Sequence, residues 1–356
     1  MKKLILGVLS LSLLYYSCQT EELSSENENQ TEELSAEEQQ KFSQYIGGFK
    51  YFLVANRGSG TVTVFDAKST EFVKEITLPD STAQPTYLAH SRRNNSFYVG
   101  DFANQKVVYY NARTFEKEGE IAIDEGAFHL WANDFVGQLW VNNIVSKTTS
   151  VIDLRSNTVI NTLPLPTAEI PQLTENAVQH DVTISLNGRF AYVTILDGAD
   201  LSYVVQYDTR TQKYIKHETV GGDAHLLATI RDLYVPSQNS SELTVFDSRK
   251  LVKKDNIEFP STHGVAGSFK YVFTTGIADQ KVGVINRFTN EVVSSIESPF
   301  AVPHNVATNF RANILFLAHS GAQQNMVSFF DVSRKGEISL KSSYPSGLNP
   351  FGVLSY

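Results

Sequence analysis

The sequence is poor in the residues that support disulfide-linked, fibrous or basic proteins. Its 356 residues include one cysteine, two methionines, 11 prolines and 21 glycines. One cysteine cannot form a disulfide within the chain, and glycine and proline are too scarce for a collagen-like or low-complexity protein. Acidic residues outnumber basic ones by 38 to 30, so the net charge is −8 and no basic excess is available for phosphate. We expect a folded protein that does not bind nucleic acid.

Common catalytic motifs are also missing. No Gly-x-Ser-x-Gly turn occurs to present a nucleophilic serine. The pair His217-Glu218 is followed by Gly221, where a zinc-binding helix would need its second histidine. A binding protein is therefore favoured over a hydrolase.

The first residues are typical of an export signal. Lys2 and Lys3 precede the apolar run 4–16, which is too short to span a bilayer, and Ser17-Cys18 follow directly. A small residue before a lone cysteine resembles a bacterial lipoprotein cleavage site. We expect residues 1–17 to be a signal peptide and Cys18 to carry the lipid. The alternative is an ordinary secretory signal with an incidental Cys18.

An acidic, weakly apolar segment follows over residues 18–46. Residues 1–46 hold eight glutamates against three lysines, so the rest of the chain carries a charge of only −3. Such a composition predicts a solvated tether. Its start, Gln19-Thr20-Glu21-Glu22, resembles the signal that some Gram-negative bacteria use to place lipoproteins on the outer face of the outer membrane, which implies a cell-surface protein. Alternatively, the acidic segment only keeps the domain soluble.

The rest of the chain is a repeat of short strands. Residues 52–56, 60–66 and 72–78 alternate apolar and polar residues between turn-forming ones, and this triplet recurs seven times over residues 49–356, about every 44 residues. Blades of four strands have this size. Residues 350–354 match an inner strand that the first copy lacks. We therefore predict an all-β, seven-bladed β-propeller over residues 49–356, in which the end of the chain completes the first blade.

The repeat text also resembles a known family. Residues 189–194, Arg-Phe-Ala-Tyr-Val-Thr, are similar to the YVTN-repeat family of seven-bladed propellers. This resemblance implies the propeller fold and a surface or periplasmic location. It implies no particular ligand, because members of the family bind unlike partners.

Histidines recur at one position of the repeat. At the start of the seven inner strands the alignment places Thr86, His129, His180, His225, His263, His304 and Phe351. Five of these seven are histidine, although the chain has only eight histidines in total. Inner strands line the channel of a propeller, so we expect a ring of imidazoles at one mouth of it.

Imidazoles that point at one axis can bind a transition metal without thiolates. His319 is expected at the same end of the last blade, and Gln179, Asp181 and Asp223 flank ring members and can fix their tautomers. The hypothesis is a copper or zinc site formed by His129, His180, His225, His263, His304 and His319, with Thr86, Gln179, Asp181, Asp223 and Phe351 lining the funnel. The alternative is that the histidines bond to loop carbonyls and lock the blades together.

The histidine ring resembles the propeller of nitrous oxide reductase, whose imidazoles hold a copper cluster. This chain has fewer ring histidines and no second domain with paired cysteine ligands, so nitrous oxide reduction is not expected. Three functions remain: a binding protein for a transition metal or a metal-bearing small ligand, a copper-dependent redox or electron-transfer protein, and a scaffold that docks an outer-membrane protein. Surface lipoproteins that capture corrinoids share this architecture, so corrinoid capture belongs with the third.

Overall fold

A computed structural model describes residues 50–309, 311 and 313–356. The predicted signal peptide, Cys18 and the tether over residues 18–46 lie outside these residues. Among the described residues, no helix is both long and apolar enough to cross a membrane.

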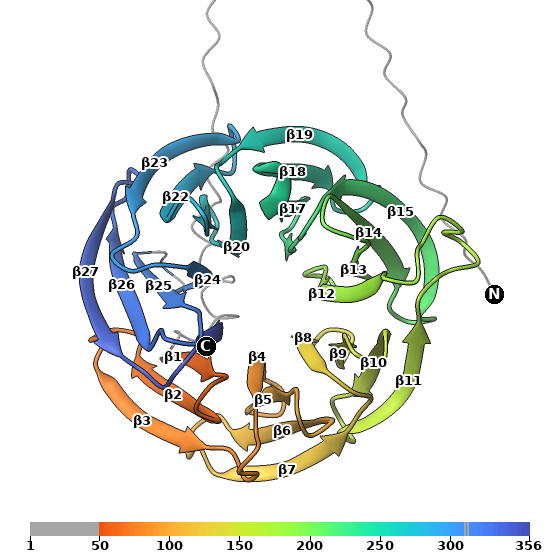
Figure 1. Cartoon of the computed structure of the whole chain (residues 1–356), viewed down its shortest axis with the longest axis horizontal. Coiled ribbons are helices and arrows are strands. Elements are labelled where there is room, and N and C mark those ends of the chain that lie inside the picture. Colours follow the sequence, from red (N-terminus) through yellow and green to blue (C-terminus); the bar gives the residue numbers. More distant parts are fainter. Residues whose placement is uncertain (1–49, 310, 312) are drawn as a thin grey trace, which may run out of the picture. The chain divides into compact units, whose positions relative to one another are not determined.

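The described chain folds into seven antiparallel sheets of four strands, arranged around a central axis (Figure 1). Its one helical element among these residues is the short 3-10 turn η1 (Gln238–Ser240). The prediction of an all-β, seven-bladed propeller is confirmed.

The blades are numbered along the chain, and their strands are given from the inner strand outward. Blade 1 consists of β28 (Pro350–Ser355), β1 (Tyr51–Asn56), β2 (Thr61–Asp66) and β3 (Phe72–Thr77). Blade 2 consists of β4 (Pro85–Ser91), β5 (Ser96–Asp101), β6 (Lys106–Asn111) and β7 (Lys117–Ala122). Blade 3 consists of β8 (Ala127–Asn133), β9 (Gln138–Asn143), β10 (Thr148–Asp153) and β11 (Thr158–Pro164). Blade 4 consists of β12 (Val178–Ile184), β13 (Phe190–Leu196), β14 (Leu201–Asp208) and β15 (Lys213–Gly221). Blade 5 consists of β16 (Leu227–Ala228), β17 (Asp232–Ser237), β18 (Glu242–Asp247) and β19 (Val252–Glu258). Blade 6 consists of β20 (Thr262–Gly267), β21 (Tyr271–Gly276), β22 (Lys281–Asn286) and β23 (Glu291–Glu297). Blade 7 consists of β24 (Pro303–Thr308), β25 (Ile314–His319), β26 (Met326–Val332) and β27 (Ile338–Pro345).

Burial explains the sequence pattern of each strand. The second strands β5 and β9 are buried along their whole length, whereas the outer strand β3 is exposed except at Ile76. The apolar core lies between neighbouring blades: Trp140 and Val151 of blade 3, for example, pack with Val193 of blade 4. Each blade therefore buries its faces against its two neighbours.

The turn between the third and fourth strands has a recurring cause. In four blades the third strand ends in an aspartate whose Oδ1 accepts the backbone N–H groups two and three residues later, at 2.7–3.1 Å: Asp66, Asp153, Asp208 and Asp247. A residue of positive φ, such as Asn157 (52°), then completes the reversal. These turns fix where each outer strand begins.

The end of the chain closes the ring. β28 pairs with β1 through Leu53↔Leu354 and Val54↔Val353, and the backbone N–H of Tyr356 donates to Tyr51 at 3.1 Å. The prediction that the last segment completes the first blade is confirmed. Closure leaves β1 with a partner on both sides.

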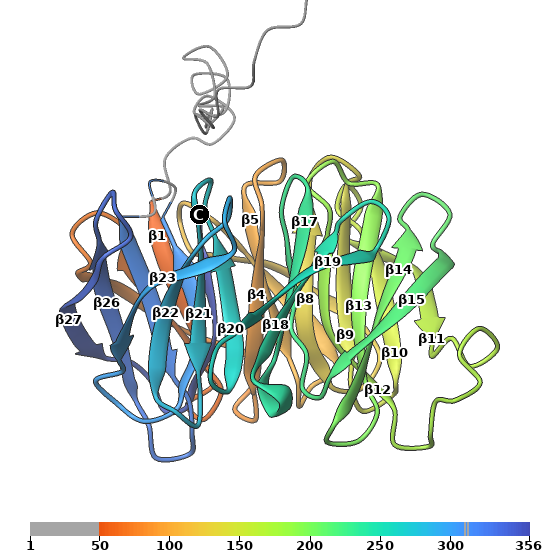
Figure 2. The ribbon, with the colours of Figure 1, turned by 90° about the horizontal axis from the view of Figure 1, so that it is seen from above.

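The strands run between two ends of the ring (Figure 2). We call one end the histidine face; it carries the loops between second and third strands and the loops that lead from one blade to the next. The opposite end, which we call the arginine face for reasons given below, carries the loops between first and second strands and between third and fourth strands. The described chain begins at Lys50 on the arginine face, because β1 starts there.

Candidate metal centre

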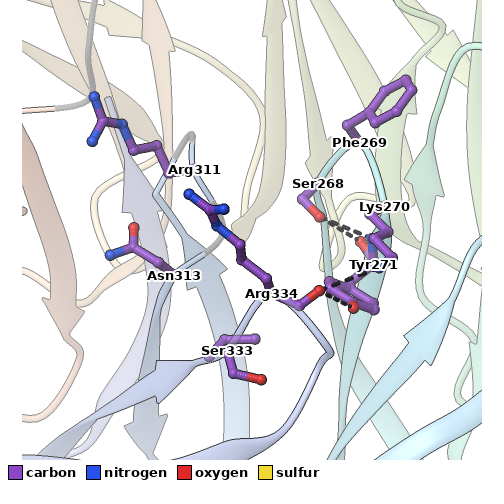
Figure 3. Close-up of a pocket in the computed structure, with 9 residues that line it drawn as sticks. Ser268, Phe269, Lys270, Tyr271, Arg311, Asn313, Ser333 and Arg334 are labelled. Carbon is purple, nitrogen blue, oxygen red and sulfur yellow. Dashed lines mark hydrogen bonds between the residues drawn. The ribbon is translucent and has the colours of Figure 1, made fainter. Parts of the chain in front are cut away.

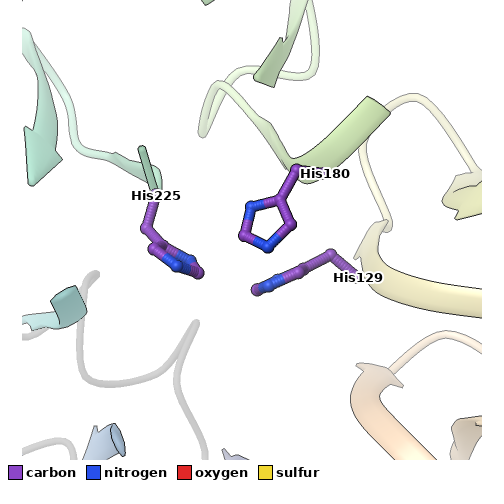
Figure 4. Close-up of side chains that lie close together, drawn as sticks. All are labelled: His129, His180 and His225. Atoms are coloured by element: carbon purple, nitrogen blue, oxygen red, sulfur yellow. The ribbon is translucent and has the colours of Figure 1, made fainter. Parts of the chain in front are cut away.

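Five consecutive blades each bring one histidine to the axis at the histidine face. His129, His180, His263 and His304 lie near the start of β8, β12, β20 and β24, and His225 lies two residues before β16. None of the five is more than 8% exposed. The imidazoles of His129, His180 and His225 converge in Figure 4. The structure thus brings the five predicted ring histidines together.

The register of the inner strands corrects one detail of the sequence alignment. The pairing of β4 with β5 skips two residues, Thr86 and Tyr87, and the pairing of β8 with β9 skips Phe128 and His129. Phe128 is therefore the counterpart of Thr86, and aligning His129 with Thr86 was wrong by one residue. In blade 5 a single residue, His225, occupies this place, because Ala224 already pairs with Ser237 in unbroken register.

The spacing of three imidazoles suits a single metal ion. The ring centroids of His129 and His180 are 5.1 Å apart, those of His129 and His225 5.1 Å, and those of His180 and His225 4.8 Å. Imidazoles that share one tetrahedral ion at 2.0–2.1 Å have centroids roughly 5 Å apart. His263 continues the cluster, with its centroid 3.9 Å from that of His225.

Asp181 sets the tautomers of two of these imidazoles. Its Oδ1 lies 2.8 Å from Nδ1 of His129 and its Oδ2 lies 3.4 Å from Nδ1 of His225. Oδ2 also accepts the backbone N–H of Leu226 at 2.9 Å. Burial by itself raises the pKa of Asp181, but the two imidazoles outweigh it and hold this pKa below its usual value. An ionised carboxylate only accepts, so both Nδ1 atoms carry the proton and both Nε2 atoms keep a free lone pair.

Four buried imidazole nitrogens have no hydrogen-bond partner among the described residues. They are Nε2 of His129 and His225 and Nδ1 of His180 and His263. Burial lowers the pKa of His129, despite the opposing charge of Asp181, and lowers those of His180 and His263 further. His129, His180 and His263 are therefore neutral near pH 7, which is the form that binds metals. Buried unpaired nitrogens are costly unless something binds them.

Asp223 adds a carboxylate at the edge of the cluster. Its oxygens lie 3.7–3.9 Å from Nε2 of His180, His225 and His263, and its side chain is 26% exposed. Its backbone is left-handed, with φ of 55°. The preceding Gly222 packs so closely on Ala199 that a Cβ would lie 1.7 Å from the carbonyl oxygen. This loop therefore holds the only partly open carboxylate of the cluster among the described residues.

Two sets of three side chains in the described residues could hold a metal ion. One set is His129, His180 and His225; the other is Asp223, His225 and His263. Because His225 belongs to both, the sets overlap at one place on the axis. Asp181 supports the first set as an orienting acceptor, as its sequence position suggested.

His304 and His319 fall outside both sets. Nδ1 of His304 lies 2.7 Å from the amide nitrogen of Asn305, and burial lowers its pKa to about 3. Nε2 of His319 lies 2.8 Å from the hydroxyl of Ser328, and burial lowers its pKa to about 4. The contacts of His319 tie β25 to β26, so its place in the structure is that of a blade-stabilising residue.

The remaining predicted funnel residues surround the cluster in different roles. The hydroxyl of Thr86 donates to the carbonyl of Ala127 at 2.9 Å and so links blades 2 and 3. The ring of Phe351 lies 4.4 Å from that of His304. Gln179 is buried, and its side-chain amide has no partner among the described residues.

Sequence reasoning missed Tyr87. Its ring stacks on His129 at 3.5 Å, and its hydroxyl accepts a hydrogen bond from Asn305 of blade 7 at 3.1 Å. Tyr87 thus covers one side of the imidazole cluster and restricts its solvent access. The signal was available: Tyr87 occupies the second bulge position, which His129 and Asp181 fill in blades 3 and 4.

Fold and site together define a seven-bladed β-propeller with a buried imidazole cluster on its axis. No protein-family model matches the sequence, and no curated protein matches it. Among solved structures, the periplasmic gluconolactonase of Pseudomonas aeruginosa is similar, with a TM-score of 0.70 and 13% identity over 87% of this chain and 99% of that one. The hydrazine synthase of Kuenenia stuttgartiensis has a TM-score of 0.63 and 11% identity over 84% and 93%. The β-propeller domain of Cps50 (Swd1) from Myceliophteria thermophila has a TM-score of 0.62 and 16% identity over 75% and 90%. These likenesses show the fold alone.

Proposed function

We propose that this protein is an exported, lipid-anchored propeller of the YVTN type that binds copper or zinc, as the ion or within a small ligand, at its axial histidines. The observation that carries the proposal is Asp181, which holds His129 and His225 with both Nε2 atoms free in a buried cluster. A carboxylate behind a histidine is the usual support of a metal-bound imidazole.

The donor set favours these two metals. The first set offers three imidazoles, and Asp223 offers one carboxylate nearby. Imidazole suits zinc and copper, whereas magnesium and calcium prefer sites made wholly of oxygen ligands. Three imidazoles also leave a fourth position of a tetrahedral ion for a small ligand or for Asp223.

The surrounding charge favours a cation. The loops of the histidine face carry nine acidic residues and two basic ones, Arg57 and Lys147. An acidic rim raises the local concentration of cations and speeds their arrival. The proposal therefore has long-range support in addition to the donor geometry.

Elemental analysis tests the proposal. Residues 41–356, purified without a histidine tag and dialysed after incubation with copper or zinc, are expected to retain about one equivalent of metal. The double variant His180→Ala/His225→Ala is expected to lose it while melting cooperatively. His217→Ala, which removes a histidine from the outer strand β15, is the matched control and is expected to retain the metal. If the unmodified protein retains neither metal, the proposal is wrong.

A further inference from the structure

We propose that the arginine face is a docking surface for an anionic lipid bilayer, so that the propeller lies on the membrane with its histidines turned away from it. This inference is independent of whether the histidines bind metal. It rests on the distribution of charge, on exposed apolar side chains, on a cavity and on the point at which the chain joins the propeller.

The arginines are almost all at one end of the molecule. Eleven of the chain's 12 arginines lie in loops of the arginine face, and the exception is Arg57. The loops of that face hold 15 basic and four acidic residues, or eight acidic ones when the four aspartates that end third strands are included. The opposite face has the reverse balance, so the near-neutral propeller is strongly polarised.

These arginines are available for a partner. Ten of the eleven are exposed, and only Arg287 is half-buried, where it donates to the carbonyl of Ser268 at 2.6 Å. No arginine of the described residues forms an ion pair with a carboxylate, whereas Lys106 and Lys254 do. Unpaired guanidinium groups suit phosphate, which they bind through two parallel hydrogen bonds.

Apolar side chains are interleaved with the basic ones. Leu186, Ile230, Phe269 and Phe288 are 39–60% exposed, and all four lie in loops of the arginine face. Each of the last three is adjacent in sequence to an arginine or lysine. Aromatic and aliphatic tips among basic residues are typical of surfaces that insert into the headgroup region of a bilayer.

A cavity on this face can receive a headgroup. It has a volume of about 510 Å³ and lies between blades 6 and 7, where Lys270, Arg311 and Arg334 surround it with Phe269 and Tyr271 (Figure 3). The hydroxyl of Tyr271 donates to the carbonyl of Arg334 at 2.9 Å and fixes one wall. The three cationic side chains suit the phosphate of a lipid headgroup, and the neighbouring aromatic side chains suit the apolar part of the lipid next to it.

The position of Lys50 selects a bilayer over other anions. The described chain starts on the arginine face, and the predicted lipid-bearing Cys18 lies 32 residues before Lys50. An anchor attached at this face brings the basic loops toward the membrane and keeps them there at high effective concentration. The competing occupant is the acidic segment of residues 18–46, which precedes Lys50 in the sequence.

Vesicle sedimentation tests this inference. Residues 41–356 lack Cys18 and contain every strand of the closed ring, which lies within the single compact unit Ile46–Tyr356. We expect this protein to partition at least about tenfold better onto vesicles that contain phosphatidylglycerol than onto pure phosphatidylcholine. The preference is expected to vanish at about 1 M salt, where the Debye length falls to about 3 Å.

Matched variants locate the surface. Arg231→Glu/Arg249→Glu/Arg334→Glu should abolish the preference, whereas Lys74→Glu/Lys147→Glu/Lys253→Glu makes the same change of net charge elsewhere and should preserve it. Both must melt like the parent; if the arginine variant does not fold, Ile230→Ser/Phe288→Ser provides the second comparison and should weaken vesicle binding at least about threefold. Equal binding to both vesicle types, or equal losses in arginine and lysine variants, overturns the proposal.

A protein that includes the acidic segment distinguishes binding of a bilayer from covering of the arginine face by that segment. Residues 19–356 include the acidic segment, and the bilayer proposal expects them to bind phosphatidylglycerol vesicles within about threefold of residues 41–356. If the longer protein binds less than about a tenth as well, the acidic segment covers the arginine face and the bilayer proposal is wrong.

Discussion

Oδ1 of Asp181 lies 2.8 Å from Nδ1 of His129, although the two residues belong to neighbouring blades. The same carboxylate reaches the next blade, because Oδ2 lies 3.4 Å from Nδ1 of His225. One buried anion therefore aligns imidazoles from both of its neighbours. This relationship converts a histidine ring, which by itself would be compatible with blade locking, into an organised set of metal-binding nitrogens.

Asp181→Asn is expected to lower metal affinity by roughly 10- to 100-fold, as for other partners behind metal-bound histidines. Asparagine can accept from Nδ1 of only one imidazole, so the proton of the other shifts to Nε2 and blocks its lone pair. Competition titration with a metal chelator measures the change.

The control for this substitution is Asp197→Asn, in which the altered carboxylate accepts the backbone N–H of Thr174 and has no histidine partner among the described residues. It should leave the affinity unchanged. An Asp181→Asn protein that binds metal as tightly as the parent would show that Asp181 does not orient metal ligands.

His319 provides a test of the boundary of the site. Because its Nε2 is paired with Ser328 inside blade 7, His319→Ala is expected to retain metal and to lower the free energy of unfolding by about 1–3 kcal/mol. His180→Ala should show the opposite combination, with metal lost and a smaller effect on stability. Calorimetry and elemental analysis on the two variants measure both quantities, and metal loss in His319→Ala would contradict the assignment.

Stability should depend on pH through His90, which is remote from the cluster and stacks on Tyr356 at 4.3 Å. Burial lowers the pKa of His90 from 6.5 to about 4, against the attraction of Asp134 and with the help of Arg92. Between these values the unfolded chain binds the proton and the folded chain does not. The stabilisation that neutral His90 adds to the free energy of unfolding is therefore fully present above about pH 6.5 and is lost as the pH falls toward 4. At pH 5 the loss is about 2 kcal/mol.

His90→Phe keeps an aromatic ring against Tyr356 and removes the titration. Denaturant unfolding at pH 7.5 and pH 5 should show a smaller loss of stability in this variant than in the parent. The comparison is between two proteins because other buried histidines shift stability in the same direction. An identical loss in both would show that His90 does not titrate in this range.

Deletion of residues 350–356 tests the closure of the ring. It removes β28, leaves the backbone of β1 unpaired on one side, and is expected to abolish cooperative melting and cause association. Phe351→Ala, which keeps the strand and removes only the ring beside His304, should melt cooperatively. Size-exclusion chromatography and thermal unfolding measure the outcome, and a monomeric, cooperative deletion variant would contradict the closure.

The sequence predicted the fold well because its turn and strand signals repeat. Alternating apolar residues in every blade, and aspartates at the ends of four third strands, specify the blades locally, and the unmatched segment at the end of the chain indicated the closure. The residue types of the site were predicted, but their exact alignment between blades was not. Phe128 and His129 together form a two-residue bulge, and this bulge arises from the pairing of β8 with β9. The role of Asp181 toward two blades likewise depends on packing between blades.

The net charge of the whole chain did not reveal the arginine face. A net charge of −8 and the lack of a basic run led us to exclude a basic surface, yet single arginines spaced along the repeat gather at one end once the strands alternate in direction. The expected absence of nucleic-acid binding stays a prediction. A count of charge by loop type would have found the polarity from the predicted topology alone.

X-ray absorption spectroscopy of the metal-loaded protein tests the central claim most directly. The account predicts copper or zinc bound by three imidazoles at about 2.0–2.1 Å, with the number of imidazoles reduced in His129→Ala. A spectrum with oxygen ligands alone, or one that is unchanged in His129→Ala, would contradict the assignment of His129, His180 and His225 as the metal centre.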